Sequence, residues 1–107
     1  MIKIYIASPY TIGDQQENVD RQRHCANELI DLGFLPIWPL SSYYLHELQP
    51  RHYEIWMTID LNLLRMCDIV LRLDGQSPGA DREVFYAQTI GIPVVYSVQE
   101  LQEFFDD

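Results

Sequence analysis

The strongest constraint on this fold is the regular alternation of short strand-like runs with one-sided helical segments. Four runs rich in aliphatic, β-branched or aromatic residues predict strands: Ile2–Ala7, Phe34–Trp38, Asp68–Leu73 and Pro93–Tyr96. Helical patterns follow them, from Asp14 to just before Gly33, over Tyr53–Met66, from Ser77 to about Ile90, and over Val98–Phe105. This order predicts an α/β fold: a three-layer open parallel sheet of four to five strands, flavodoxin- or Rossmann-like, with helices on both faces and right-handed crossovers.

Local signals place several boundaries of these elements. Asp14 followed by Glu17 has the form of a capping box, and Gly33 suits the end of the same helix. Pro36 indicates a strand at the sheet edge, since proline donates no ladder hydrogen bond. Asp68–Leu73 is nearly all apolar, which suits a strand covered on both faces. Pro39 to Pro50 is expected to be a long aromatic-rich connection.

Length and composition predict one cytoplasmic domain over residues 1–107. At 107 residues and 48% hydrophobic content the chain can bury a core. It is small enough that a homodimer or higher homo-oligomer is expected to help it. No apolar run approaches the ~20 residues of a membrane span, and no signal peptide precedes the first strand. Cys25 and Cys67 lie far apart, so no disulfide framework or metal site is expected, and no cofactor.

The charge balance narrows the class of partner. Seven Lys and Arg residues stand against sixteen Asp and Glu, a net charge of −9. Such a surface repels nucleic acid polymers and anionic membranes, whereas backbone N–H groups can still hold the phosphate of a small nucleotide. Neither GxGxxG nor a P-loop is present, which removes support for those dinucleotide and triphosphate sites. Arg51 and Arg72 are interpreted as ion-pair partners, and the three histidines as structural or surface residues.

Ligands of open parallel sheets bind beyond the carboxyl ends of the strands, which here means the loops Ser8–Gly13 and Asp74–Gly79. In the first loop, Ser8, Pro9 and Tyr10 are candidate ligand contacts, and Pro9 also keeps the loop stiff.

The second loop opens a helix whose start is the most informative stretch of the chain. Ser77 is a natural N-cap and Pro78 a natural first helical residue. Gly79 and Ala80 are then expected to offer unpaired N–H groups to a phosphate or carboxylate. Glu83 lies one turn inside the helix, where a carboxylate facing the pocket is placed to attack an anomeric carbon. The alternative is simply a well-capped helix with a favourable acid near its start.

Two further residues are candidates for the same site. Asp60 lies between apolar neighbours on the helix that enters the third strand, although a lone helical Asp is usually solvated. Tyr5 in the first strand fits the core, yet its phenol can reach the strand-end pocket and orient a carboxylate. Two carboxylates from separate elements suit glycosidic chemistry, in which one attacks and the other handles protons.

Three segments together resemble the nucleoside 2-deoxyribosyltransferase-like superfamily over nearly the whole chain. They are Ile4-Tyr5-Ile6-Ala7-Ser8-Pro9-Tyr10, Tyr53-Glu54-Ile55-Trp56-Met57-Thr58-Ile59-Asp60 and Ser77-Pro78-Gly79-Ala80-Asp81-Arg82-Glu83. The chain is most similar to a small branch described as a domain of unknown function. The resemblance implies that Glu83 is a nucleophile that attacks C1′ of a deoxyribose. It also implies that Asp60 assists departure of the base and that Tyr5 holds the nucleophile.

The same resemblance bears on the substrate. Ser77 and Gly79 match the pattern of deoxynucleoside 5′-monophosphate N-glycosidases, which bind a phosphate there, and this favours a nucleotide hydrolase over a nucleoside transferase. The chain departs from both groups in carrying Val84-Phe85-Tyr86 after the candidate nucleophile and no basic residue in the first loop.

Three other interpretations stay open at this point. One is a nucleotide-binding sensor module that uses the same pocket without cleavage. Another is a phosphoribohydrolase, although the longer glycine run of those enzymes is missing. The last is an interaction protein that uses the aromatic segment Tyr43–Tyr53 as a contact face, a segment that also fits a lid or a dimer surface.

Overall fold

The computed structural model, which describes residues 1–106, is built on one parallel sheet. Its strands are β1 (Lys3–Ala7), β2 (Leu35–Ile37), β3 (Ile69–Arg72) and β4 (Val94–Val95). Their order is β2-β1-β3-β4, and every neighbouring pair is parallel. The predicted α/β class is therefore confirmed, with four strands. The chain reverses its direction of travel across the sheet between β1 and β3, so the carboxyl ends of these two strands form the switch point where such folds bind ligands.

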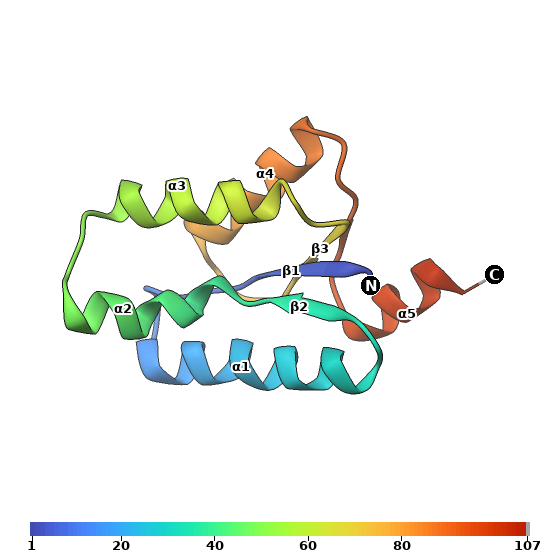
Figure 1. Cartoon of the computed structure of the whole chain (residues 1–107), viewed down its shortest axis with the longest axis horizontal. Helices are drawn as coiled ribbons and strands as arrows, with labels where there is room; N and C mark the ends of the chain where they lie inside the picture. The colour runs from blue at the N-terminus through green and yellow to red at the C-terminus, as the bar shows by residue number, and fades with distance from the viewer. Residues whose placement is uncertain (107) are drawn as a thin grey trace.

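Helices cover both faces of this sheet (Figure 1). α1 (Gln15–Asp31) and α5 (Val98–Phe105) lie on one face, and α3 (Tyr53–Leu64) and α4 (Pro78–Thr89) on the other. A short 3₁₀ helix, η1 (Pro39–Ser42), and α2 (Tyr43–Leu48) lead from β2 to α3 at one end of the molecule. Within residues 1–106, no helix combines the length and the apolar character that a membrane crossing requires.

Alternation along β1 divides the core into two layers and decides which side chains reach the site. Ile4 and Ile6 are fully buried against the α1 and α5 side. Tyr5 and Ala7 point to the opposite face, where they pack with residues of α3 and α4. Because successive strand residues alternate between faces, Tyr5 lies on the same side of the sheet as α4 and its Glu83.

The caps and the edge strand follow the sequence prediction. The carboxylate of Asp14 accepts a hydrogen bond from the backbone N–H of Glu17 at 3.0 Å and starts α1. β2, with Pro36 at its centre, pairs only with β1 and forms one edge of the sheet. All four residues of β3 are buried, as expected of a strand covered on both faces.

The structure adds two features to these expectations. The aromatic-rich Pro39–Pro50 connection contains η1 and α2, and the proline at the first position of η1 is already set for a helical turn. In α3, which the sequence predicted over Tyr53–Met66, Ile55 and Ile59 stay about half exposed. α3 has apolar residues around much of its circumference, and it packs on the core through Met57 and Leu64 instead.

Candidate active site

A cavity of about 680 Å³ opens beyond the carboxyl ends of β1 and β3, within the size range of small-molecule sites. Its walls come from the loops after these two strands and from η1, α2, α3 and α4. Most of the residues singled out from the sequence line this one cavity, namely Ser8, Tyr10, Asp60, Ser77, Gly79, Ala80 and Glu83. Residues from three distant segments therefore share one space.

A buried pair, Tyr5 and Glu83, borders the cavity through Glu83, while Tyr5 lies behind it and is not a lining residue. The phenol O–H of Tyr5 donates to Oε2 of Glu83, although 78 positions separate them in the sequence. Tyr5 is fully buried and Glu83 is only 6% exposed. Burial, against the opposing Tyr5 hydrogen bond and Arg72 and with a smaller contribution from the nearby Asp60, raises the pKa of Glu83 to about 8. Burial also raises the pKa of Tyr5 well above 10, so the phenol stays a hydrogen-bond donor.

Asp60 presents a second carboxyl to the cavity from α3. Its Oδ1 is buried, and no hydrogen-bond partner for it is found among residues 1–106. Burial raises the pKa of Asp60 to about 7. A buried acceptor without a partner is costly, so a ligand that donates to it would relieve that cost. Two carboxyl groups with pKa values near neutrality can each hold or release a proton at physiological pH, which is what acid–base catalysis requires.

The start of α4 borders the same cavity. Ser77 caps the helix, and its Oγ accepts a hydrogen bond from the N–H of Ala80 at 3.0 Å. The expectation that the Ala80 N–H is unpaired is therefore wrong, because the cap itself consumes it. Pro78 has no N–H, and the N–H of Gly79 lies in the first turn, where no intrahelical carbonyl is in reach. A Cβ atom added at Gly79 would lie 3.5 Å from the Tyr53 hydroxyl, an ordinary contact distance.

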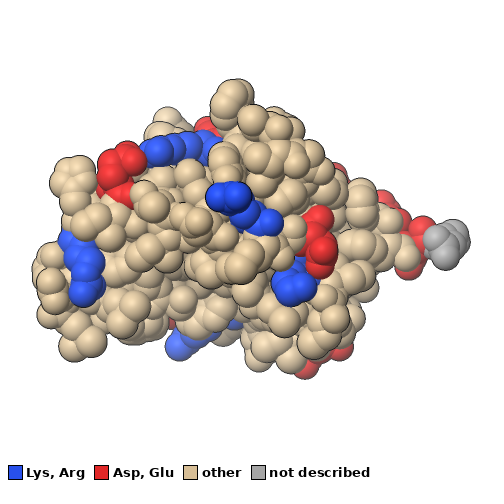
Figure 2. Space-filling model, turned by 45° about the horizontal axis from the view of Figure 1, so that its top comes forward, with Lys and Arg blue, Asp and Glu red and all other residues tan. Residues whose placement is uncertain are grey.

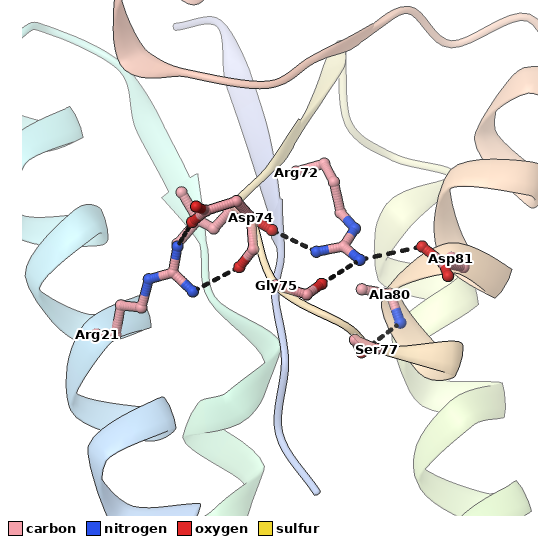
Figure 3. A network of polar contacts seen from close by, with 8 residues as sticks. Arg21, Arg72, Asp74, Gly75, Ser77, Ala80 and Asp81 are labelled. Carbon is pink, nitrogen blue, oxygen red and sulfur yellow. Dashed lines mark hydrogen bonds and ion pairs between the residues drawn. The ribbon is translucent and has the colours of Figure 1, made fainter. Parts of the chain in front are cut away.

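Two arginines hold the turn between β3 and α4 (Figure 3). Arg72 is buried, and its guanidinium donates to the carbonyl of Leu73, to the carbonyl of Gly75 at 2.9 Å and to the carboxylate of Asp81 at 3.0 Å. Arg72 is thus the ion-pair partner that the sequence predicted. From the other side, Arg21 donates to the carbonyl of Asp74 at 2.7 Å and forms an ion pair with its carboxylate. The turn that delivers Ser77 to the cavity is therefore fixed from both sides.

Pro9 acts on this turn rather than on the cavity surface. It is buried and is not among the lining residues. Gly75 has a φ of +116°, and a Cβ atom added there would lie 2.8 Å from Cγ of Pro9. The loop after β1 and the loop after β3 therefore approach so closely that only glycine fits between them.

Gln22 links the sheet to the opposite wall of the cavity. Its side chain is almost fully buried, donating to the carbonyl of Ile6 at 3.1 Å and to Oγ of Ser8 at 2.8 Å. Its Oε1 accepts from the N–H of Leu40 at 2.8 Å. Sequence reasoning missed this residue, whose only signal was a polar side chain on the apolar face of α1.

Four aromatic side chains and one arginine form another wall of the cavity, here called the aromatic wall. They are Tyr10, Tyr43, His46, Trp56 and Arg51. Nδ1 of His46 accepts a hydrogen bond from Nε1 of Trp56 at 2.8 Å, and the Arg51 guanidinium carbon lies 5.5 Å from the Trp56 ring centroid. The rings of Tyr10 and Tyr43 meet edge to face at 6.4 Å. The sequence predicted a structural or surface role for His46, and the structure also places this residue in the lining of the cavity. Arg51 was expected in an ion pair, yet the described residues contain no carboxylate partner for it.

Apart from the buried Arg72, the basic side chains are dispersed over the surface. On the face drawn in Figure 2, Lys and Arg are scattered among uncharged residues and form no continuous basic patch. Four arginines are held in ion pairs, listed with their partners as Arg21–Asp74, Arg23–Asp20, Arg72–Asp81 and Arg82–Glu54.

Comparisons with known proteins agree with this geometry. Residues 2–97 match the family model described as Domain of unknown function (DUF7768). No curated protein matches the sequence. Among solved structures, the chain is similar to a 2-deoxyribosyltransferase from the psychrotolerant bacterium Bacillus psychrosaccharolyticus. The identity is 26% and the TM-score 0.63, over 86% of this chain and 69% of that one. The resemblance drawn from the three segments is confirmed: this chain belongs to the DUF7768 family and has a nucleoside 2-deoxyribosyltransferase-like fold.

Proposed function

We propose that this chain breaks the N-glycosidic bond of a nucleoside or nucleoside 5′-monophosphate, with Glu83 as the nucleophile and deoxyribose as the favoured sugar. The observation that carries the proposal is the buried carboxyl of Glu83, bound by the Tyr5 hydroxyl, in a cavity that contains a second carboxyl. The similarity to a 2-deoxyribosyltransferase supports the class of substrate.

In the first step, Glu83 attacks C1′ of the sugar from the face opposite the base. Tyr5 binds Oε2, which leaves Oε1 as the attacking oxygen. The C1′–N bond breaks and its electron pair moves to the base nitrogen, which receives the proton of Asp60. Positive charge develops on the sugar ring at this stage, and the adjacent carboxylate stabilises it. The products are the free base and a glycosyl ester on Glu83.

In the second step, an acceptor attacks C1′ of the ester. Asp60, now ionised, removes a proton from the acceptor, and the bond between C1′ and Oε1 breaks, which releases the carboxylate of Glu83 with Tyr5 still bound to Oε2. Water as acceptor gives the free sugar or sugar phosphate, while a second base gives transfer. The pattern Ser77–Gly79 favours water and a phosphorylated substrate in this proposal.

The reactive form needs Glu83 ionised and Asp60 protonated. The pKa values of about 8 and about 7 mean that both groups titrate close to neutrality, so the reactive form is a minor one. Tyr5 contributes by donating to the ionised form of Glu83, which lowers its pKa relative to burial alone.

Chromatographic detection of free base tests the proposal. The protein is incubated with deoxynucleosides, deoxynucleoside monophosphates and ribonucleotides, beside Glu83→Gln, which keeps the shape and the bond from Tyr5. We expect release by the wild type and a loss of about 10²–10⁴-fold or more in the variant. Equal release by both proteins would exclude Glu83 as the nucleophile. Binding of a nucleotide without any release would instead assign a nucleotide-binding module.

A further inference from the structure

The charged groups of the cavity are few and unbalanced. Among its lining residues, Asp60 and Glu83 are the carboxyl groups and Arg51 is the only Lys or Arg. In a chain of net charge −9, a basic side chain that lines a cavity would ordinarily form an ion pair with one of the many carboxylates. Within residues 1–106, however, the charged guanidinium of Arg51 contacts only a backbone carbonyl, that of Gln49 at 3.3 Å, and the Trp56 ring.

The backbone and the neighbours of Arg51 hold it in position. Its N–H donates to Nδ1 of His46 at 3.2 Å, the same nitrogen that accepts from Trp56. Its guanidinium carbon lies 5.5 Å from the Trp56 ring centroid, within the range of a cation–π contact. An aromatic support of this kind restrains the side chain while leaving its N–H edges free for a ligand.

A near neighbour of Arg51 in the chain contacts the start of α4. Two residues further on, Tyr53 begins α3, and its hydroxyl would lie 3.5 Å from a Cβ atom at Gly79. Gly79 precedes Glu83 by about one helical turn on α4. A ligand whose sugar lies at Glu83 would therefore have two neighbouring surfaces, the first turn of α4 and the aromatic wall that includes Arg51.

We propose that Arg51 recognises a phosphate on the ligand, so that this site prefers a nucleoside monophosphate to the nucleoside itself. The inference rests on the proposed function for where the sugar lies. A guanidinium matches phosphate with two parallel N–H bonds, and the exposed side chain of Arg51 can reach a ligand in the cavity that it lines. The two carboxyl groups oppose this anion less than their number implies, since their raised pKa values leave each of them partly protonated near neutrality.

Paired substrates with and without the phosphate provide the test. Base release and binding by calorimetry are measured for one deoxynucleoside and its 5′-monophosphate, with wild type, Arg51→Gln, Arg51→Lys and Arg65→Gln. Arg65 is an exposed arginine at the end of α3 that does not line the cavity, so its variant removes the same charge elsewhere. Circular dichroism and thermal melting establish that each variant is folded.

Arg51→Gln is expected to lower kcat/KM and affinity for the monophosphate by about 10–100-fold and to change those for the nucleoside by less than about threefold. Arg51→Lys should retain part of the preference, and Arg65→Gln all of it. Added salt should weaken monophosphate binding to the wild type more than to Arg51→Gln.

The possible failures are distinguishable. Base release with equal losses for both substrates in Arg51→Gln would overturn the role of Arg51 and leave the proposed function standing. Arg51-dependent binding of the monophosphate without any base release would support the phosphate site and overturn the proposed function. If Arg65→Gln lost as much affinity and kcat/KM for the monophosphate as Arg51→Gln, the effect would come from the overall charge of the protein, and the inference would be refuted.

Discussion

Replacing Glu83 by Gln should stabilise the protein increasingly as the pH rises. Glu83 is buried, and its pKa of about 8 lies far above the ordinary value of 4.5. The folded protein therefore binds this proton more tightly than the unfolded chain does. Between pH 4.5 and about 8 the unfolded chain holds fewer protons at this group, so its contribution to the free energy of unfolding falls with rising pH. The contribution is fully present below pH 4.5 and fully lost above about 8.

The size of the effect follows from the two pKa values. A difference of about 3.5, at ~1.36 kcal/mol for each pKa unit, sets an upper limit of about 5 kcal/mol. Water entering the open cavity can hydrate the ionised carboxylate, so we expect roughly 2–5 kcal/mol at pH 9. Gln has nearly the same shape and its amide oxygen can accept the bond from Tyr5, so wild type and variant should have similar stability at pH 4.5.

Urea unfolding, followed by the fluorescence of Trp38 and Trp56 at pH 4.5, 7 and 9, measures this difference. Glu28→Gln is the matched control, because Glu28 is exposed on α1 and its replacement also removes one negative charge. We expect the stability gain of Glu83→Gln over Glu28→Gln to grow with pH. A gain that does not change with pH, or a variant less stable than the wild type at pH 9, would refute the argument that burial of Glu83 destabilises its ionised form.

Three further predictions concern the same site. If Glu83 must be ionised and Asp60 protonated, a plot of kcat/KM for base release against pH should be bell-shaped. Its limbs should lie near pH 7 and 8 and its maximum at about 7.5. A sigmoidal profile would contradict the two roles. Gly75→Ala should lower the free energy of unfolding, measured by urea titration, by about 1–3 kcal/mol, because the residue has a positive φ and the new methyl group would lie 2.8 Å from Pro9. Gly79→Ala has room for a methyl group and should change the free energy of unfolding by less than about 1 kcal/mol. Arg72→Met should cost about 1–3 kcal/mol by the same measurement, since it leaves the carbonyl bonds of the β3–α4 turn unmade, while the exposed Asp81 carboxylate stays hydrated; a neutral result would show that the ion pair and carbonyl bonds do not hold this turn.

Much of the fold was predictable because the controlling signals are local. Periodicity identified the strands and the helices around them, and the caps at Asp14 and Ser77 lie where the sequence placed them. The shared cavity of Asp60 and Glu83 was also predictable, since parallel strands gather the following loops at one edge of the sheet.

Other features depend on contacts between distant residues, which no local pattern contains. In an acidic chain the sequence predicts an ion pair for Arg51. In the fold, Arg51 instead lies over the Trp56 ring and lines the cavity, a contact that no local pattern predicts. Gln22 reads as an ordinary helical residue until β1 and η1 are seen on either side of it. The raised pKa of Glu83 likewise follows from its depth of burial, a property of the assembled domain.

The edge strand β2 constrains how copies of this chain can associate. The N–H of Leu35 points inward to the carbonyl of Ile2, so by alternation the nitrogen of Pro36 faces away from the sheet. An incoming strand would find no donor there, and at the opposite edge β4 offers only two residues. Continuation of the sheet from one molecule into the next is therefore disfavoured at both edges. If the expected homodimer forms, its contact surface should therefore be built from helices and loops rather than from a sheet that runs through both copies.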